Sequence, residues 1–320
     1  MKILVTGTAG FIGMHVAASL LDDGHEVVGL DNFNAYYSVQ LKRDRHARLV
    51  ARRGYTGVEG DLCDAALLQK LFAEHRFERV CNLAAQAGVR YSLTNPEVYE
   101  KSNLNGFLNI LEACRHHGTT RLVYASSSSV YGGNTKLPFS ESDPVDRPIS
   151  LYAATKKANE LMAHTYTHLF KLQTVGLRFF TVYGPWGRPD MAMWLFTAAM
   201  LKGKPIQVFN HGNMRRDFTY VDDIVQGVKA SLFAPALNPY EVINLGNHNA
   251  EPLKTMIDVL AAALGVEPKM EFLPMQPGDV EATYADIALA QAKLGFQPHT
   301  KIAEGIPKFV AWYKEYHRAS

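Results

Sequence analysis

Short apolar runs alternate with longer helical stretches along the first two-thirds of the chain. The apolar runs predict strands at Lys2–Thr6, Glu26–Leu30, Thr56–Glu59, Arg79–Leu83, Arg121–Ala125 and Thr174–Arg178. The helical stretches include Phe11–Asp22, Ala65–His75, Tyr99–His116 and Leu151–Phe170. Such alternation is typical of a parallel sheet with crossover helices, and the Val, Ile and Leu content of the strands indicates that both faces of the sheet are covered.

After about residue 180, proline and glycine interrupt shorter elements. They stand at Pro185, Gly187, Pro189, Gly203 and Pro205, and then at Pro235, Pro239, Pro252 and Pro268. We therefore expect an α/β fold with two parts. A Rossmann-type, doubly wound parallel sheet would occupy residues 1–180, and a smaller mixed α/β region that binds substrate would occupy residues 181–320, with some interleaving of the chain between them.

A glycine-rich turn joins the first predicted strand to the first predicted helix. Gly7, Gly10 and Gly13 form a G-x-x-G-x-x-G pattern, which allows a tight turn and lets a pyrophosphate approach the helix amino terminus. Asp31 closes the second strand, where a carboxylate accepts hydrogen bonds from the adenosine ribose and repels a 2′-phosphate. These residues predict a site for NAD rather than NADP; the alternative is a structural turn with chance glycines.

The residues that point most directly to chemistry are Tyr152 and Lys156. Side chains four residues apart lie on one face of a helix, about a turn from each other. An ammonium beside a phenol stabilises the phenolate, which can then take a proton from an alcohol well below the ordinary phenol pKa of about 10. Downstream of a dinucleotide site, the pair predicts redox chemistry on a hydroxyl group.

Composition narrows the class of function. The chain has 33 Lys and Arg against 31 Asp and Glu and no long basic tract, so we expect neither nucleic acid nor a membrane as its main partner. The amino terminus enters a strand without a signal-peptide pattern, and no apolar run approaches the ~20 residues of a membrane span. Three cysteines without C-x-x-C spacing predict reduced thiols in the cytoplasm, and scattered histidines predict no metal.

Four serines, at positions 126–129, follow the fifth predicted strand, at the end where parallel sheets bind ligands. Alone they would indicate only a polar turn. Together with Tyr152 and Lys156 they resemble the extended short-chain dehydrogenases that act on nucleotide sugars, in which a Ser or Thr, a Tyr and a Lys form the catalytic triad. Ser127 has the family's spacing before Tyr152, so it is the expected hydroxyl that hydrogen-bonds the reacting oxygen.

Longer motifs narrow the resemblance to the UDP-glucuronate 4-epimerases. They are Asp31-Asn32-Phe33-Asn34-x-Tyr36-Tyr37, Leu41-Lys42-Arg43, the runs at 83–92 and 179–192, Arg216-Asp217-Phe218-x-Tyr220-Val221-x-Asp223, and Gln276-Pro277-Gly278-Asp279-Val280. The match spans nearly the whole chain. Its most specific blocks are A-G-V-R-Y-S and T-V-Y-G-P-W-G-R-P-D-M-A, whereas the glycine pattern and Y-x-x-x-K are shared by the superfamily.

The resemblance implies two sets of contact residues. The expected cofactor-binding residues are Gly7, Gly10, Phe11, Ile12, Gly13, Asp31, Asn32, Asp61, Leu62, Ala84, Ala85, Asn103, Tyr152, Lys156 and Phe179. The expected substrate-binding residues are Arg90, Ser127, Ser128, Ser129, Tyr152, Thr181, Arg188, Gln207, Phe209 and Arg216. A helix cap is the alternative for Asp61, a solvated loop arginine for both Arg188 and Arg90, and a core side chain for Phe209.

Within the substrate set, the resemblance divides the roles by chemistry. Thr181, Arg188 and the serines would hold the carboxylate of a uronic acid, which needs a cation or several donors. Arg216 would bind the UDP diphosphate, and Gln207 and Phe209 would lie along uracil.

The implied reaction is the reversible C4 epimerisation of UDP-glucuronate to UDP-galacturonate with tightly bound NAD. Tyr152, helped by Ser127, removes the C4 hydroxyl proton while hydride passes to NAD; Lys156 bonds the nicotinamide ribose and lowers the pKa of Tyr152. The transient 4-keto sugar turns over and takes the hydride back on its other face. The resemblance also implies a homodimer, formed by the helices around Tyr152 and around Tyr99–His116.

Three other activities and one non-catalytic role are alternatives to this interpretation. A 4-keto uronate is a β-keto acid that tends to lose CO2, so UDP-glucuronate decarboxylase is the nearest alternative, followed by UDP-glucose/UDP-galactose 4-epimerase. A 4,6-dehydratase is disfavoured because Ser128 and Ser129 stand where such relatives carry an Asp-Glu pair. A non-catalytic NAD(H)-sensing protein would usually lack the tyrosine or the lysine.

Overall fold

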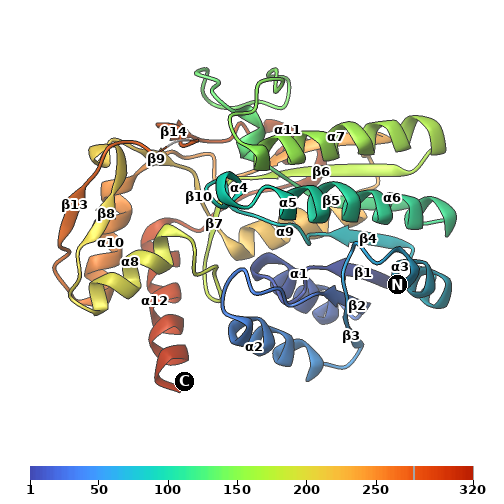
Figure 1. Cartoon of the computed structure of the whole chain (residues 1–320), viewed down its shortest axis with the longest axis horizontal. Coiled ribbons are helices and arrows are strands. Elements are labelled where there is room, and N and C mark those ends of the chain that lie inside the picture. Colours follow the sequence, from blue (N-terminus) through green and yellow to red (C-terminus); the bar gives the residue numbers. More distant parts are fainter. Residues whose placement is uncertain (277, 320) are drawn as a thin grey trace.

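A seven-stranded parallel sheet forms the centre of the computed structural model, which describes residues 1–276 and 278–319 (Figure 1). The strand order is β11-β6-β5-β4-β1-β2-β3. The strands are β1 (Lys2–Thr6), β2 (Glu26–Asp31), β3 (Tyr55–Glu59), β4 (Arg79–Asn82), β5 (Arg121–Ser127), β6 (Gln173–Phe179) and β11 (Tyr240–Leu245). The chain winds outward in opposite directions from β1 and β4, which confirms the doubly wound α/β prediction.

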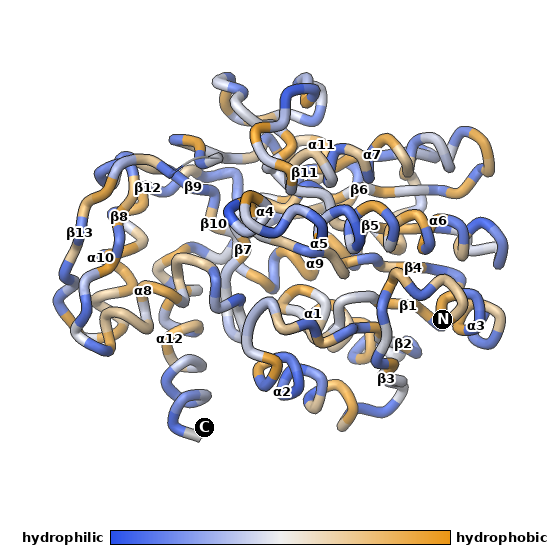
Figure 2. Tube along the Cα trace, viewed as in Figure 1, coloured by the Kyte–Doolittle hydropathy of each residue, from blue (hydrophilic) through white to orange (hydrophobic). Residues whose placement is uncertain are grey.

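Helices cover both faces of this sheet. One face carries α1 (Phe11–Asp22), α2 (Val39–Val50), α9 (Val221–Phe233) and α11 (Ala288–Leu294); the other carries α3 (Ala65–His75), α6 (Gly106–His116) and α7 (Leu151–Phe170). Strand β1 shows why two cores form, because Ile3 and Val5 face one core while Leu4 faces the other. Hydrophobic and hydrophilic turns alternate along α6 and α7 in Figure 2, as in helices with one buried side.

Most predicted elements have their expected bounds. The helices Phe11–Asp22, Ala65–His75 and Leu151–Phe170 and the strand Lys2–Thr6 are confirmed residue for residue, and the other predicted strands differ by one or two residues at one or both ends. The predicted helix Tyr99–His116 is wrong in detail. It consists of α5 (Glu97–Tyr99), the π-helical segment η1 (Glu100–Asn105) and α6. The wider turn follows from tertiary contacts, because the carbonyl of Asn103 accepts a hydrogen bond from Asn159 of α7.

A smaller region lies at one end of the sheet (Figure 1). Its short strands are β7 (Thr181–Tyr183), β8 (Ile206–Val208), β9 (Arg215–Arg216), β10 (Phe218–Tyr220), β12 (Glu251–Pro252), β13 (Met270–Phe272) and β14 (Ala282–Thr283). Its helices are α8 (Ala192–Leu201), α10 (Leu253–Leu264) and α12 (Ile302–Ala319). Between β10 and β12 the chain returns to the main sheet, where α9 packs on α1 and β11 pairs with β6. The division at residue 180 stays a prediction.

Candidate active site

The glycine turn after β1 is shaped by close backbone contacts. Gly7 has a φ of +76°, and a Cβ there would lie 2.9 Å from the backbone nitrogen of Ala84. A Cβ at Gly13 would lie 2.0 Å from the carbonyl oxygen of Gly7, and one at Gly10 would lie 2.9 Å from the same atom. Helix α1 then begins at Phe11 without a side-chain cap or an acidic residue in its first turn. Its N–H groups and dipole therefore favour an anion at this point.

Asp31 ends β2 beside this turn. Its two carboxylate oxygens accept hydrogen bonds from the backbone N–H groups of Ala9, at 3.0 Å, and Phe33, at 2.9 Å. The next predicted pair also meets, since Asn32 donates to Asp61 at 2.7 Å. Asp61 is not the cap of α3; Asp64 is, because its side chain accepts from the backbone of Leu67. The helix-cap alternative for Asp61 is therefore wrong.

The remaining predicted cofactor residues line the ends of neighbouring strands. Ala84 and Ala85 follow β4, where the backbone N–H of Ala84 donates to the Thr6 hydroxyl at 3.1 Å. Leu62 is buried in the core beneath, and Phe179 ends β6 opposite Ser127. Their contacts with a cofactor stay predictions.

Asn103 makes hydrogen bonds within the protein that the sequence did not indicate. It bonds to both the N–H and the carbonyl of Gln86, at 2.8 and 3.0 Å, and donates to the Thr155 hydroxyl at 3.0 Å. It thereby joins the segment after β4 to the helix that carries Tyr152. A direct contact with the cofactor stays a prediction.

Ser127 and Tyr152 meet at the carboxyl end of β5. Ser150 caps α7 by accepting from the backbone of Ala153 at 3.1 Å, which sets Tyr152 in the first turn of the helix. Ser127 accepts a hydrogen bond from the backbone N–H of Ser129 at 3.1 Å. Burial raises the pKa of Tyr152, while the hydrogen bond with Ser127 and the charge of Arg188 lower it in part.

The ammonium of Lys156 forms its hydrogen bond with a strand carbonyl. Its Nζ donates to the carbonyl of Ala125 at 2.9 Å and lies 5.9 Å from the centre of the Tyr152 ring. Burial lowers the pKa of Lys156 to about 8. The expected lowering of the Tyr152 pKa by Lys156 stays a prediction, since the ammonium lies near the Tyr152 ring but forms its hydrogen bond with the strand.

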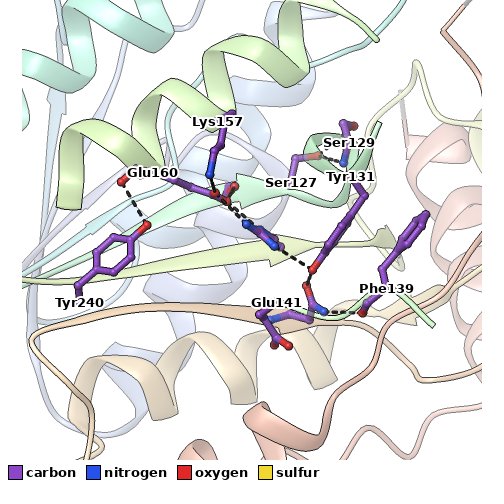
Figure 3. Close-up of polar contacts among 11 residues, drawn as sticks. Ser127, Ser129, Tyr131, Phe139, Glu141, Lys157, Glu160 and Tyr240 are labelled. Carbon is purple, nitrogen blue, oxygen red and sulfur yellow. Dashed lines mark hydrogen bonds and ion pairs between the residues drawn. The ribbon is translucent and has the colours of Figure 1, made fainter. Parts of the chain in front are cut away.

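A buried ion pair connects the elements around the carboxyl end of β5 (Figure 3). Arg178 of β6 binds Glu160 of α7 through two hydrogen bonds, of 2.8 and 2.9 Å, and Glu160 also accepts from the Ser126 hydroxyl at 2.7 Å. The exposed fractions of the Arg178 and Glu160 side chains are only 3% and 1%. Arg178 also donates to the Tyr131 hydroxyl at 3.0 Å, so the ion pair joins α7, β5 and β6.

Arg188 is held in a network opposite the catalytic strand end. Its Nε donates to Asp190 at 3.0 Å, a terminal nitrogen donates to the other oxygen of the same carboxylate, and the Tyr36 hydroxyl donates to Asp190 at 2.9 Å. Although burial alone would raise it, Arg188 and Tyr36 hold the pKa of Asp190 below its usual value. The alternative of a solvated loop arginine is wrong, because Arg188 is a partly buried, paired cation close enough to Tyr152 to lower that residue's pKa.

A second group of predicted residues gathers farther along the site. Arg90 donates to Asp279 at 2.9 Å, and its guanidinium lies 4.6 Å from the centre of the Phe209 ring. Phe209 is partly buried and packs against the main hydrophobic core, so the alternative of a core side chain stays open. Arg216 belongs to the same group, because burial lowers its pKa while Asp279 raises it and Arg90 lowers it further. Of the motif that contains Asp279, Pro277 lies outside the described residues.

The other predicted substrate residues occupy positions compatible with their expected roles. Thr181 begins β7, paired with Phe218 of β10, and Ser128 begins the 3-10 turn η2 (Ser128–Tyr131) next to Ser127. Gln207 is exposed on β8 between two buried neighbours, so it faces away from the core. The roles of all these residues stay predictions.

Several residues of the site were not predicted. Tyr36, Asp190 and Asp279 lie inside motifs that indicated the resemblance, but nothing in their local pattern assigned them a partner. Arg45 of α2 lies just beyond such a motif, and its contacts reach loops far away in the sequence. Membership of a specific motif was the available signal for the first three.

The glycine turn, Asp31 and the uncapped start of α1 fit an adenine dinucleotide. A Cβ at any of the three glycines would collide with the backbone, and no acidic side chain opposes a pyrophosphate in the first turn of α1. Together with Tyr152, Lys156 and Ser127 at the neighbouring strand end, these features define a nicotinamide-dependent enzyme that acts on a hydroxyl group.

Comparisons with known proteins agree with this class. A model of the NAD dependent epimerase/dehydratase family matches residues 3–246, and the chain belongs to that family. Protein CapI of Staphylococcus aureus is 50% identical over 99% of this chain and 100% of that protein. UDP-glucuronate 4-epimerase 4 of Arabidopsis thaliana is 51% identical over 99% of this chain and 76% of that protein.

A solved structure is similar over the same length. The UDP-glucuronic acid 4-epimerase of Bacillus cereus, in complex with UDP-glucuronic acid and NAD, has a TM-score of 0.93 and 35% sequence identity, covering 99% of this chain and 100% of the other. Within residues 1–276 and 278–319, no helix is long and apolar enough to cross a membrane, and no group of three His, Cys, Asp or Glu residues could hold a metal ion.

Proposed function

We propose that this protein interconverts UDP-glucuronate and UDP-galacturonate by reversible epimerisation at C4, with tightly bound NAD. The observation that carries the proposal is the partly buried, paired Arg188, whose charge acts on the pKa of the acid–base candidate Tyr152. A cation beside the reacting position suits a sugar that carries a carboxylate. The family and the similarity to UDP-glucuronate 4-epimerases support the same substrate.

In this proposal, the glycine turn and Asp31 would hold NAD, which would supply a reversible hydride acceptor for oxidation of the sugar at C4. Tyr152 takes the proton of the C4 hydroxyl and gives it back, and Ser127 donates a hydrogen bond to the same oxygen. A proton acceptor whose pKa is raised by burial needs positive charge nearby, which the nicotinamide ring and Arg188 supply. Lys156 holds its place through Ala125 and binds the nicotinamide ribose.

Arg188 would hold the substrate carboxylate with the donors that Asp190 leaves over. Asp190 engages Nε and one terminal nitrogen, so the other terminal nitrogen would donate to the sugar together with Thr181 and Ser129. Holding the carboxylate limits decarboxylation of the 4-keto sugar, because loss of CO2 needs a particular orientation of the carboxylate relative to the ketone. At the other end of the substrate, Arg216 and Arg90 bind the diphosphate and Phe209 lies along uracil.

The decisive experiment is incubation of the purified protein with UDP-glucuronate and no added NAD, followed by NMR of the sugar nucleotides and of CO2. We expect UDP-galacturonate to appear up to an equilibrium mixture without pentose. UDP-xylose or a 4-keto pentose would instead identify a decarboxylase. No change even with added NAD, followed by turnover of UDP-glucose, would identify an epimerase of neutral hexoses.

Assembly and location are part of the same proposal. Exposed apolar side chains on α6 and α7, namely Leu108, Leu161, Leu169 and Phe170, suit a homodimer that packs these helices together. The free cysteines Cys63, Cys81 and Cys114 suit a reducing cytoplasm. Light scattering that gives the mass of one chain would contradict the dimer.

A further inference from the structure

Arg45, on α2, is a fully buried cation whose donors are all used. Nη1 donates to the carbonyl of Ala9 at 3.1 Å and to the Tyr37 hydroxyl at 2.7 Å. Nε and Nη2 donate to the carbonyl of Trp186 at 3.2 and 2.7 Å, and Nη2 also donates to the carbonyl of Gly187 at 2.9 Å. All five hydrogen bonds go to uncharged oxygen atoms.

Four of the five hydrogen bonds go to two parts of the active site that are far apart in the sequence. Ala9 lies in the glycine turn, and Trp186 and Gly187 directly precede Arg188. A single side chain therefore joins the cofactor turn to the loop that presents the cation of the sugar site.

The Trp186 loop depends on this support. Trp186 has a φ of +62°, in the left-handed region that residues other than glycine rarely adopt. Its carbonyl receives two of the five hydrogen bonds of Arg45. Its ring packs against Trp312 and Tyr316 of α12, with centroid distances of 5.2 and 5.3 Å. The backbone that leads to Arg188 is thus held by hydrogen bonds from Arg45 and by packing of the Trp186 ring against α12.

The hydrogen bonds of Arg45 do not balance its positive charge. A buried guanidinium bonded only to neutral oxygens is unfavourable unless an anion lies nearby. The Asp31 carboxylate, which accepts from the backbone N–H of Ala9, lies at the same turn, and the amino terminus of α1, which follows Ala9, is a further place suited to an anion. A dinucleotide pyrophosphate bound there would supply the opposite charge.

We propose that Arg45 is a positioning residue that couples the two ligand sites. It holds the glycine turn in its anion-binding form and the Trp186 loop in the form that presents Arg188. The second half of this proposal rests on the proposed function, whereas the first half concerns retention of NAD and is measured directly.

The test compares Arg45→Met and Arg45→Lys with the wild-type protein. Three quantities are measured: NAD content per purified chain, melting temperature, and the ratio of kcat/KM for UDP-glucuronate to that for UDP-glucose. Arg45→Met should retain at least about tenfold less NAD and lower the ratio about tenfold, the size expected for one charged hydrogen bond. Arg45→Lys should keep most of its NAD, since the charge remains, yet lower the ratio because an ammonium cannot span both loops.

A matched control lies on the same helix. Arg48 has its guanidinium 5.1 Å from the centre of the Trp186 ring. Arg48→Gln should change the ratio by less than about twofold, as an exposed cation–π contact contributes little. Equal effects of Arg45→Met and Arg48→Gln would contradict the proposal.

Two further results would overturn it. One is an unchanged NAD content and an unchanged ratio in folded Arg45 variants; the other is a lower melting temperature with both quantities unchanged per folded chain. If the Arg45 variants do not fold, Tyr37→Phe decides, since it removes one acceptor and should lower NAD content or the ratio about threefold. If the wild-type protein does not convert UDP-glucuronate, the proposed function fails, while the NAD content still tests the coupling.

Discussion

Two buried arginines support opposite sides of the active site, and their charges are compensated differently. Arg178, behind the Ser127–Tyr152 side, binds Glu160 through two hydrogen bonds. Arg45, behind the Arg188 loop, donates only to uncharged oxygens. Arg178 thus has its counter-ion in the protein, whereas Arg45 has no carboxylate among its hydrogen-bond partners. The difference indicates that one arginine serves the scaffold and the other serves the ligands.

The largest effect is expected at Tyr152, the reacting group on the Ser127–Tyr152 side of the site. Tyr152→Phe should lower kcat by about 10³-fold, because it removes the group that accepts and returns the C4 proton. Its NAD content should not change, since the glycine turn is untouched. Tyr166→Phe is a control on the same helix, as that hydroxyl binds Glu112 away from the site. A Tyr152→Phe protein that turns over at a tenth of the wild-type rate would assign the proton to another group.

The scaffold role of Arg178 is tested by removing its partner. Glu160→Ala should lower the free energy of unfolding by about 3–5 kcal/mol, because it leaves a buried guanidinium without its carboxylate. The measurement is urea unfolding followed by circular dichroism. Replacing both residues by methionine should restore part of the loss. If the double variant is less stable than Glu160→Ala, the charge balance is not what stabilises this side.

The ligand role of the other side is tested at Arg188. Arg188→Met should lower kcat/KM for UDP-glucuronate. The loss of transition-state stabilisation should be about 1.5–3 kcal/mol, the range of a hydrogen bond to a charged group. Turnover of UDP-glucose should change far less. Because this substitution leaves Asp190 unpaired, Arg188→Met with Asp190→Asn is the control. Equal losses for both sugars would mean that Arg188 shapes the loop without reading the carboxylate.

The smallest effect concerns Lys156 and pH. Its folded-state pKa of about 8 lies below its ordinary value of 10.5. Between these two pH values the unfolded chain keeps a proton that the folded chain has lost, so raising the pH favours the folded state. The stability of the wild-type protein relative to Lys156→Met should therefore rise by about 1 kcal/mol from pH 8 to pH 9. A difference that stays constant with pH would refute a buried, readily deprotonated lysine.

Local patterns predicted the parts of the fold and site that depend on neighbours in the sequence. The glycine turn, the strand ends and the placement of Tyr152 one turn before Lys156 all follow from short spacings and from capping by Ser150. The resemblance added residues such as Arg90 and Phe209, which the structure brings together.

Partners that lie far apart in the sequence could not be predicted. Tyr36 and Asp190 are separated by 154 residues, and Arg45 and Trp186 by 141. No periodicity links such positions, because their contact arises only when the loops of two parts of the fold pack together. The direction of the Lys156 side chain is another example, since it depends on a free carbonyl at Ala125 on a neighbouring strand.

The return of the chain to the main sheet determines how this protein could be recombined with its relatives. Helix α9 packs on α1, and β11 completes the sheet beside β6, although both follow β7 to β10 in the sequence. A single crossover at residue 180 would exchange α9 and β11 together with the sugar-binding loops and would set a foreign α9 against the original α1. A chimera that respects the packing instead keeps residues 221–245 together with α11, which packs on α9 and β11, and exchanges the remaining segments after residue 180. The scaffold of the sheet is therefore not one continuous stretch of the sequence.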